Sequence, residues 1–272
     1  MEIQLWRELL EPYELTVQEL VGKFEHLKKG YRIRGEYSPI EEVSGRVKSI
    51  ASILAKAQRK NIPLERIEEE MYDIAGVRVI CQFVEDIALV VDMVRGRDDM
   101  EVIDERDYVD HIKESGYRSY HMIIRYEAHT LSGPKKVNAE IQIRTLGMNF
   151  WATIEHSLQY KYSSNIPPKI GAKLIKAAQA IVVLDEQLSD VRGDIMDAQN
   201  SLLSQNRLIA EILSAIENLY HIANIREVAK IQDEFYRIYE QGDMEKMRRF
   251  ARELDMIAEG YRAQTVQTED EK

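Results

Sequence analysis

Two carboxylates, Asp73 and Glu140, stand in segments whose residue pattern predicts strands, and each has cationic residues beside it. Segment 136–144 alternates apolar and polar residues, so one face of its strand is buried and the other carries polar side chains, namely Glu140, Gln142 and Arg144. A carboxylate in the middle of a sheet is costly to bury unless a metal, a base or a hydrogen-bond donor interacts with it. On spacing alone, an ordinary glutamate on a solvated strand face is the simpler explanation, and the rest of the chain changes that balance.

Asp73 begins the hexapeptide Asp73-Ile-Ala-Gly-Val-Arg78, at the entrance to a predicted buried strand over 77–83. Together with Glu140 it supplies the minimum for holding one Mg²⁺ by oxygen ligands, while the ion keeps waters and takes its other ligands from substrate phosphates. Cationic residues of the same region would neutralise a polyphosphate: Arg46, Lys48, Lys56, Arg59 and Arg78. Phosphoryl transfer depends mostly on positioning and charge stabilisation, with one group left to deprotonate the attacking hydroxyl. Glu140 can serve as both ligand and base.

A cationic stripe lies on the helix predicted over 49–61, for which Ser49 is the candidate N-cap. Its members recur at helical spacing and are Ser52, Lys56, Arg59 and Lys60. A solvated helix face is the usual explanation of such a stripe. Here Arg46 and Lys48 directly precede the helix, where unpaired backbone amides and the helix dipole also favour phosphate.

Segment 111–156 contains a lysine, a Gly-Tyr-Arg turn and a histidine before Glu140. Strands are predicted over 119–126 and 136–144, joined by the turn Ser132-Gly133-Pro134. We therefore expect this segment to form the floor of a catalytic site.

The composition is that of an ordinary soluble protein, with 272 residues, 44% of them hydrophobic and 31% charged. No apolar run reaches the roughly 18 residues of a membrane span, and the acidic N-terminus does not resemble a secretion signal, so no membrane association and a cytoplasmic location are expected. The net charge of −10 argues against a broad nucleic-acid binder. The one cysteine, Cys81, excludes an internal disulfide and is expected to be buried.

Strand and helix patterns alternate up to about residue 145 and are followed by helices alone, which predicts an α+β fold. Other helices are expected over 3–34, 63–72 and 84–96, a helical turn over 38–41, and further strands over 43–48 and 100–108. After Pro167-Pro168, helices are expected over 169–206, 207–223 and 225–240, and from 243 onward. The expected organisation is a main domain over 1–205, a helical extension over 206–263 for oligomerisation or partner binding, and a disordered acidic tail over 264–272.

Four motifs, in order and spacing, resemble the synthetase domain of the RelA/SpoT family, specifically its stand-alone small alarmone synthetases of RelQ type. They are Asp73-Ile-Ala-Gly-Val-Arg78, Lys113-Glu-Ser-Gly-Tyr-Arg-Ser-Tyr-His121, Glu140-Ile-Gln-Ile-Arg-Thr145 and Trp151-Ala-Thr-Ile-Glu-His156. The resemblance covers roughly residues 1–205 and implies a mixed β-sheet, nucleotidyltransferase-like core flanked by helices. The implied reaction moves the β,γ-pyrophosphate of ATP to the 3′-hydroxyl of GTP or GDP, which gives AMP and pppGpp or ppGpp in the stringent response.

The resemblance also implies roles for individual residues. Asp73 and Glu140 resemble the Mg²⁺ ligands, with Glu140 activating the 3′-hydroxyl. Arg46 and Arg78 resemble a pair that sandwiches adenine, and the residues implied for the ATP phosphates are Lys48, Ser52, Lys56 and Arg59. Tyr117 resembles the residue that stacks on guanine, and the other residues implied for GTP or GDP are Lys113, His121, Gln142 and Asn149.

RelQ-type proteins are expected to be homotetramers whose central cleft binds alarmone as an activator. Here Glu25 and the pair Glu41-Glu42 stand where that cleft would want neutral or cationic groups, so we do not expect this regulation to be unchanged. The family's hydrolase signature, a His-Asp dipeptide, does not occur, and alarmone degradation is not expected. Two alternatives stay open: a pyrophosphokinase acting on adenosine nucleotides or an RNA end, and a non-catalytic module that binds nucleotide or single-stranded RNA.

Overall fold

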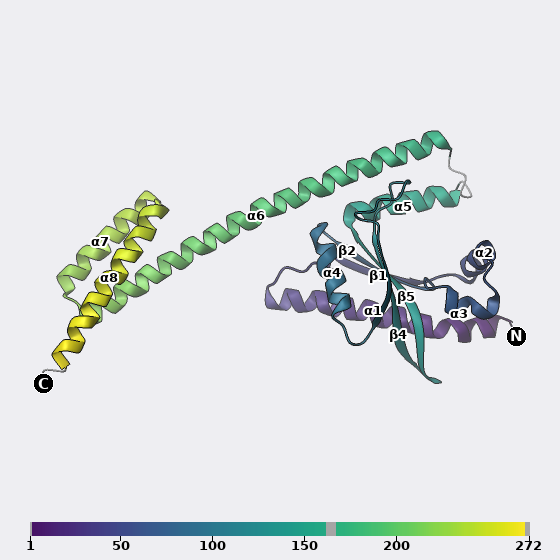
Figure 1. Ribbon diagram of the computed structural model, residues 1–272, viewed down its shortest axis with the longest axis horizontal. Helices are drawn as coiled ribbons and strands as arrows, with labels where there is room; N and C mark the ends of the chain where they lie inside the picture. Colours follow the sequence, from purple (N-terminus) through teal and green to yellow (C-terminus); the bar gives the residue numbers. More distant parts are fainter. Residues whose placement is uncertain (1, 162–166, 270–272) are drawn as a thin grey trace. The chain divides into compact units, whose positions relative to one another are not determined.

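A computed structural model describes residues 2–161 and 167–269 (Figure 1). The chain divides into two compact units, Met1–Asp190 and Val191–Lys272. In chain order the elements are α1 (Glu2–Arg34), β1 (Glu42–Val47), α2 (Ile50–Lys60), the 3-10 turn η1 (Leu64–Arg66), α3 (Ile67–Glu70), β2 (Ala75–Cys81), α4 (Glu85–Arg95), β3 (Glu101–Asp107), β4 (Tyr120–Thr130), β5 (Gly133–Thr145), α5 (Leu146–Lys161), α6 (Pro168–Ile222), α7 (Ile225–Gln241) and α8 (Met244–Glu269). The predicted α+β class is confirmed.

One five-stranded mixed sheet organises the first unit, with strand order β1-β2-β5-β4-β3. The central pair β2 and β5 is parallel, and every other pair is antiparallel. Strand β4 is longer than predicted because it continues into a hairpin in which Thr130 pairs with Gly133. Gly133 has a φ of 110° and begins β5, so the predicted turn at 132–134 lies one residue earlier.

The two faces of the sheet differ as the alternation predicts. Along β5 the apolar positions are all buried, and they are Val137, Ala139, Ile141 and Ile143. Helix α1 packs on the sheet against β1, β2, β4 and β5 (Figure 1). At Gly45 an added Cβ would lie 2.6 Å from a methyl of Val17 and 2.8 Å from one of Val21, so glycine is what lets α1 approach β1. The remaining face is free to carry polar side chains.

Two local predictions were wrong. Residues 38–41 form no helical turn, because the Ser38 hydroxyl bonds to the backbone of Ile40 and the amide of Glu41 donates to the carbonyl of Ile80, which aligns the segment with the sheet. The helix expected over 63–72 is reduced to η1 and α3, since Met71 is already extended.

Cys81 is fully buried, as expected, and burial raises the pKa of its thiol.

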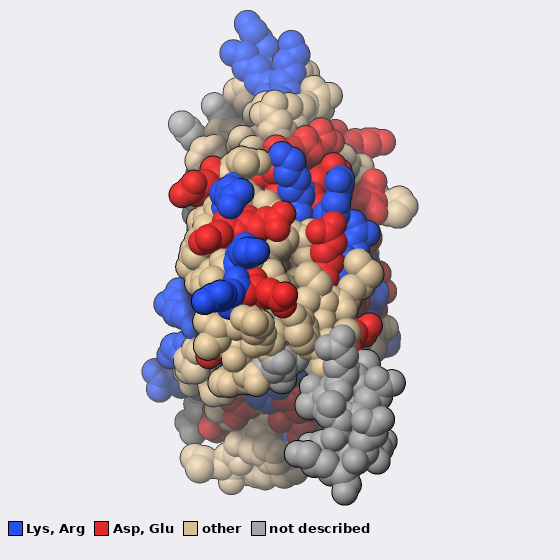
Figure 2. Space-filling model, turned by 90° about the vertical axis from the view of Figure 1, so that its left-hand side faces the viewer, with Lys and Arg blue, Asp and Glu red and all other residues tan. Residues whose placement is uncertain are grey.

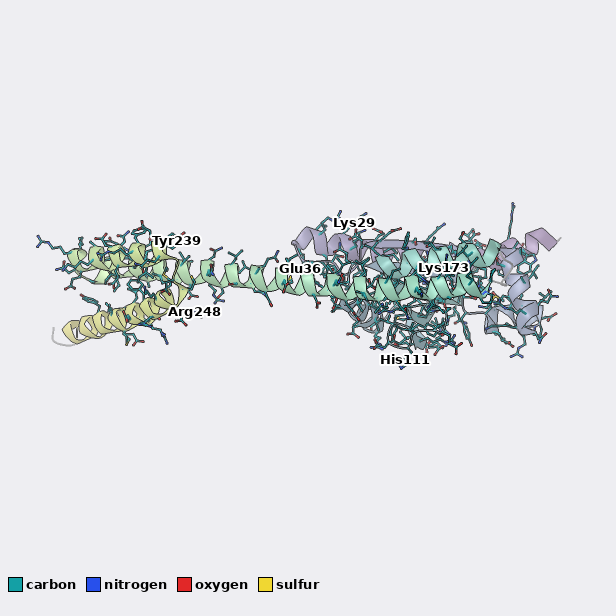
Figure 3. All side chains as sticks on the ribbon, turned by 90° about the horizontal axis from the view of Figure 1, so that it is seen from above. Lys29, Glu36, His111, Lys173, Tyr239 and Arg248 are labelled. Atoms are coloured by element: carbon teal, nitrogen blue, oxygen red, sulfur yellow. The ribbon has the colours of Figure 1, made fainter. Side chains whose placement is uncertain are left out.

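The second unit packs the end of α6 against α7 and α8 around its own apolar core, in which Leu219, Val228 and Phe235 are almost fully buried. Asn224 caps α7 and Gly242, in the left-handed region, ends it. Tyr239 and Arg248 lie on the surface of this unit (Figure 3). The expected break at 206 is absent because neither glycine nor proline occurs between Gly193 and the end of α6.

Helix α8 continues to Glu269, whereas a disordered tail was expected from residue 264, and no glycine or proline interrupts that stretch. Residues 270–272 lie outside the described residues. In the part of the chain described, no helix has the length and apolar character needed to traverse a lipid bilayer.

Candidate active site

The polar face of the sheet brings predicted site residues from four strands into register. Ser44 of β1 pairs with Arg78 of β2, which pairs with Gln142 of β5, which pairs with His121 of β4. A second row, two residues along, joins Arg46, Gly76 and Glu140. Side chains in register point to the same side of a sheet, so these groups share one surface.

A cavity of about 200 Å³ lies on this surface. Its lining includes Asp73 and Glu140, which are far apart in the sequence. The other lining residues are Ser44, Gly45, Arg46, Lys48, Gly76, Val77, Arg78 and Gln142. The two predicted catalytic carboxylates therefore face one cavity, together with three of the cations predicted for ATP.

Asp73 is held by two lysines. Its Oδ2 pairs with the ammonium of Lys48 and, at 2.6 Å, with that of Lys56. Burial alone would raise the pKa of Asp73, but the hydrogen bonds and positive charges of the two lysines outweigh it and lower that pKa. Burial also lowers the pKa of Lys48, against the opposing effect of Asp73. Asp73 is thus a carboxylate with two lysines on one oxygen.

Glu140 is held on both oxygens. His121 Nδ1 lies 2.9 Å from Oε1, and Gln142 Nε2 donates to Oε2 at 2.7 Å. Burial tends to raise the pKa of Glu140, yet the contacts with His121 and Gln142 prevail and lower it, while the charge of Asp73 opposes them. Glu140 is therefore a half-buried carboxylate with a fixed orientation, beside a second carboxylate.

Three buried side-chain polar atoms lack a hydrogen-bond partner among the described residues: Asp73 Oδ1, Arg78 Nε and Asn149 Oδ1. All three belong to residues predicted for metal or nucleotide binding. A buried polar atom without a partner is costly and is found where a ligand supplies the partner. In the described residues no cluster of three or more His, Cys, Asp or Glu side chains could hold a metal. The donor set of Asp73 and Glu140 nonetheless fits Mg²⁺, which draws its remaining ligands from water and phosphate.

Two of the residues predicted for the acceptor nucleotide, Lys113 and His121, contact Tyr117. The Lys113 ammonium lies 4.9 Å from the centre of the Tyr117 ring, and the Tyr117 hydroxyl lies 2.8 Å from His121 Nε2. Gly116 has a φ of 90°, and a Cβ there would lie 2.6 Å from Ala178, so glycine is needed to turn the chain in front of Tyr117. Asn149 lies on α5.

Seven predicted residues do not line the cavity: Ser52, Lys56, Arg59, Lys113, Tyr117, His121 and Asn149. Lys56 is nevertheless joined to the site by its ion pair with Asp73, and His121 by its contact with Glu140. Ser52 and Arg59 are exposed on α2, where the Ser52 amide donates to the capping Ser49 hydroxyl at 3.3 Å. Their predicted contact with ATP phosphates stays a prediction.

Two neighbours of the site were not predicted. Arg144 is 4% exposed and donates to Tyr117 and Gln142, each at 2.6 Å. Tyr108 stands edge-on to His121, and the Lys113 ammonium lies 4.1 Å from the centre of its ring. Strand alternation already put Arg144 on the face of Glu140, whereas nothing in the local sequence singles out Tyr108.

Comparison with known proteins gives the ancestry of this arrangement. The family model described as the region found in RelA/SpoT proteins matches residues 45–165. The GTP pyrophosphokinase YjbM of Bacillus subtilis is 53% identical over 199 residues, which make up 73% of this chain and 94% of that protein. The chain belongs to the RelA/SpoT family. This confirms the resemblance on which the residue roles were based.

Solved structures of this family agree. The small alarmone synthetase 1 of Bacillus subtilis bound to its product pppGpp matches with a TM-score of 0.69 and 53% identity, over 71% of this chain and 98% of that one. The same synthetase bound to AMPCPP matches with a TM-score of 0.64 and 48% identity, over 71% and 99%. More than a quarter of this RelA/SpoT protein lies outside these matches.

Proposed function

We propose that this protein is a (p)ppGpp synthetase, which transfers the β,γ-pyrophosphate of ATP to the 3′-hydroxyl of GTP or GDP and releases AMP. The observation that carries the proposal is the pair Asp73 and Glu140, which face one cavity among arginines and lysines. Relatives named as GTP pyrophosphokinases and a relative solved with pppGpp support it.

On the donor side, Arg46 and Arg78 hold adenine between their guanidinium planes. They lie on adjacent strands two residues out of register. Such diagonal neighbours are roughly 7–8 Å apart, about the separation that two planes need to enclose one aromatic ring. Lys48 and Lys56 leave Asp73 and bind the phosphates, since a triphosphate carries more negative charge than one carboxylate, and Ser52 and Arg59 extend this cationic surface along α2.

Asp73 and Glu140 would hold Mg²⁺, which supplies charge neutralisation of the transferred group when it is bound. Asp73 Oδ1 already lacks a hydrogen-bond partner. When Lys48 and Lys56 move to the phosphates, Asp73 Oδ2 is released as well, so both oxygens become available to Mg²⁺. On the acceptor side Tyr117 stacks on guanine, with Lys113, His121, Gln142 and Asn149 around the acceptor. Glu140 takes the proton of the 3′-hydroxyl as that oxygen attacks the β-phosphorus and AMP departs.

The test is to incubate the protein with Mg²⁺ and γ-labelled ATP, adding GTP, GDP, an adenosine nucleotide or a short RNA in turn. Label should enter GTP or GDP, with AMP formed only when such an acceptor is present. Transfer to an adenosine nucleotide or RNA end would favour the alternative pyrophosphokinase, and binding without turnover would favour a non-catalytic module.

Replacing Arg78 by lysine keeps the charge but removes the planar group. Stacking of a base on a side chain is worth about 1–3 kcal/mol, so KM for ATP should rise about tenfold or more while KM for GTP changes little. Steady-state kinetics with each substrate varied measures this. Arg125→Lys, on an exposed ion pair of β4, is the matched control, and an unchanged KM for ATP in Arg78→Lys would refute the sandwich.

The protein should also assemble into a homo-oligomer, for which a tetramer is proposed. In the second unit, apolar residues of α6 recur four and seven residues apart yet are 51–58% exposed: Val191, Ile195 and Leu202. Spacings of four and seven fit the 3.5-residue repeat of helices that pair, and these residues are called the seam. We propose that the seam binds a second copy of the chain.

Ile195→Glu should therefore dissociate the assembly, because the charge would enter the seam, whereas Met196→Glu should not. The two side chains are adjacent and similarly exposed, at 51% and 45%, but only Ile195 lies in the seam. Light scattering coupled to gel filtration over a range of concentrations measures the mass. If both variants had the same mass, the seam would not be part of the interface.

Binding of alarmone or single-stranded RNA as a regulator stays a weaker proposal. The described residues on the face seen in Figure 2 intersperse Lys and Arg with Asp and Glu, whereas RNA held by its phosphates needs a basic stripe. Glu42 begins β1 and is exposed, and Glu41 accepts a hydrogen bond from Gln82. Activation by alarmone should accordingly be weak.

A cytoplasmic location is also proposed for this protein.

A further inference from the structure

Arg144 is a buried arginine whose hydrogen bonds all go to neutral side chains. It is 4% exposed, and among the described residues it has no ion pair. Its Nε donates to the Ser119 hydroxyl at 3.1 Å. Its Nη2 donates both of its hydrogens, one to the Tyr117 hydroxyl oxygen and one to Gln142 Oε1, each at 2.6 Å. Burying an unpaired cation is costly, so this position requires an explanation.

The first branch from Arg144 has a direction set by chemistry. A guanidinium can only donate hydrogen bonds, so the Tyr117 oxygen accepts from it and its own hydrogen remains for His121 Nε2, 2.8 Å away. When Nε2 of a neutral imidazole accepts, its proton must be on Nδ1. Nδ1 then donates to Glu140 Oε1 at 2.9 Å. The carboxylate of Glu140 accepts from the same Nδ1 proton, so one nitrogen of Arg144 supports, through Tyr117, the His121 tautomer that holds Glu140.

The second branch orients an amide. Because Arg144 Nη2 donates to Gln142 Oε1, the amide nitrogen of Gln142 is directed the other way, where it donates to Glu140 Oε2 at 2.7 Å. An inverted amide would face Arg144 with its NH₂ group and leave Glu140 without this donor. Both oxygens of Glu140 are thus oriented from the same guanidinium nitrogen.

We propose that Arg144 is a positioning residue for pyrophosphate transfer, which fixes the carboxylate of Glu140 through Tyr117–His121 on one side and Gln142 on the other. This inference rests on the proposed function, in which Glu140 is the base. It also gives the Tyr117 hydroxyl a task separate from its ring: the ring stacks on the acceptor base, and the hydroxyl relays the orientation of Arg144.

Two substitutions separate these tasks. Tyr117→Phe keeps the ring and removes the relay, so kcat should fall about tenfold, the effect of one hydrogen bond, while KM for GTP and for ATP stays within about twofold. Arg144→Met removes the group that orients His121 and Gln142, the two donors to Glu140. In this variant kcat should fall about 100-fold, as expected for a misplaced catalytic group. Arg144→Lys restores the charge but not the forked geometry and should not restore kcat. Arg125→Met is the matched control and should retain wild-type kcat.

A spectroscopic measurement on the full chain needs no turnover. With nitrogen-15 in the histidines, and His121 assigned by its absence from a His121→Gln variant, the wild type should show the proton on Nδ1. In Tyr117→Phe the Nε2 signal should move toward that of an acceptor nitrogen without a hydrogen bond, because the donor to Nε2 is gone. Tyr117→Phe is close to isosteric, so this comparison stays available if Arg144→Met does not fold.

An unchanged His121 Nε2 signal or an unchanged kcat in Tyr117→Phe would overturn the proposal, as would wild-type kcat in folded Arg144→Met. Failure of the proposed function looks different: either no acceptor gains label from ATP, or Glu140→Gln retains turnover, whatever the His121 signals show.

Discussion

Replacing Glu140 by glutamine is expected to lower kcat by about 10³-fold, within the range that a positioned general base contributes, because an amide cannot accept the proton of the attacking hydroxyl. Both oxygens of Glu140 accept hydrogen bonds, so the new NH₂ group must face one former donor. The variant should therefore also lose about 1–3 kcal/mol of stability. Rapid quenching with labelled ATP measures the transfer step, and chemical denaturation measures the loss.

Glu101→Gln is the control for this substitution. Glu101 is an exposed strand glutamate that pairs with Arg125 at 3.2 Å, outside the cavity of the site. It should change neither turnover nor stability by a measurable amount, since exposed ion pairs contribute little. Binding of a non-hydrolysable ATP analogue should stay within about threefold in Glu140→Gln. Turnover close to that of the wild type would exclude Glu140 as the base.

Asp73→Asn is expected to lower kcat by a comparable factor, about 10³-fold, without weakening the binding of ATP in the absence of metal. In the wild type Asp73 competes with phosphate for Lys48 and Lys56. Removing its charge frees both lysines, so ATP should bind at least as tightly in the absence of Mg²⁺. Addition of Mg²⁺ should then tighten ATP binding less than in the wild type, because one ligand of the ion is lost. Calorimetric titration of ATP with and without Mg²⁺ measures both effects.

Asp99 offers a control with the same local design. Its carboxylate also bridges two cations, Lys23 and Arg97, and their hydrogen bonds and charges lower its pKa against the effect of burial. It lies outside the cavity that Asp73 and Glu140 line. Asp99→Asn should leave kcat and the Mg²⁺ dependence of ATP binding unchanged. If Asp73→Asn bound ATP more weakly without metal, the competition for the two lysines would be disproved.

Regular periodicity explains which parts of the fold were predictable. Apolar and polar residues alternate along 136–144, and burial follows that alternation through Ile143, so the strand and the polar side of Glu140 follow from the sequence. The cap at Ser49 was likewise predictable, because the signal and its hydrogen bond are local. Segment 38–41 was not, since a local capping signal lost to a long-range hydrogen bond from Glu41 to Ile80. The length of α6 was missed because apolar spacing does not mark where a helix ends.

The candidate site shows the same division. Residue types and spacing indicated two carboxylates amid cations, and the resemblance of four motifs gave the family and the reaction. Strand pairing decided which groups meet: Arg78, Gln142 and His121 come into register only when β2 and β5 pair in parallel beside β4. The ring that connects Arg144 to both oxygens of Glu140 also arises there, because hydrogen-bond direction depends on which donors and acceptors the fold places within about 3 Å of one another.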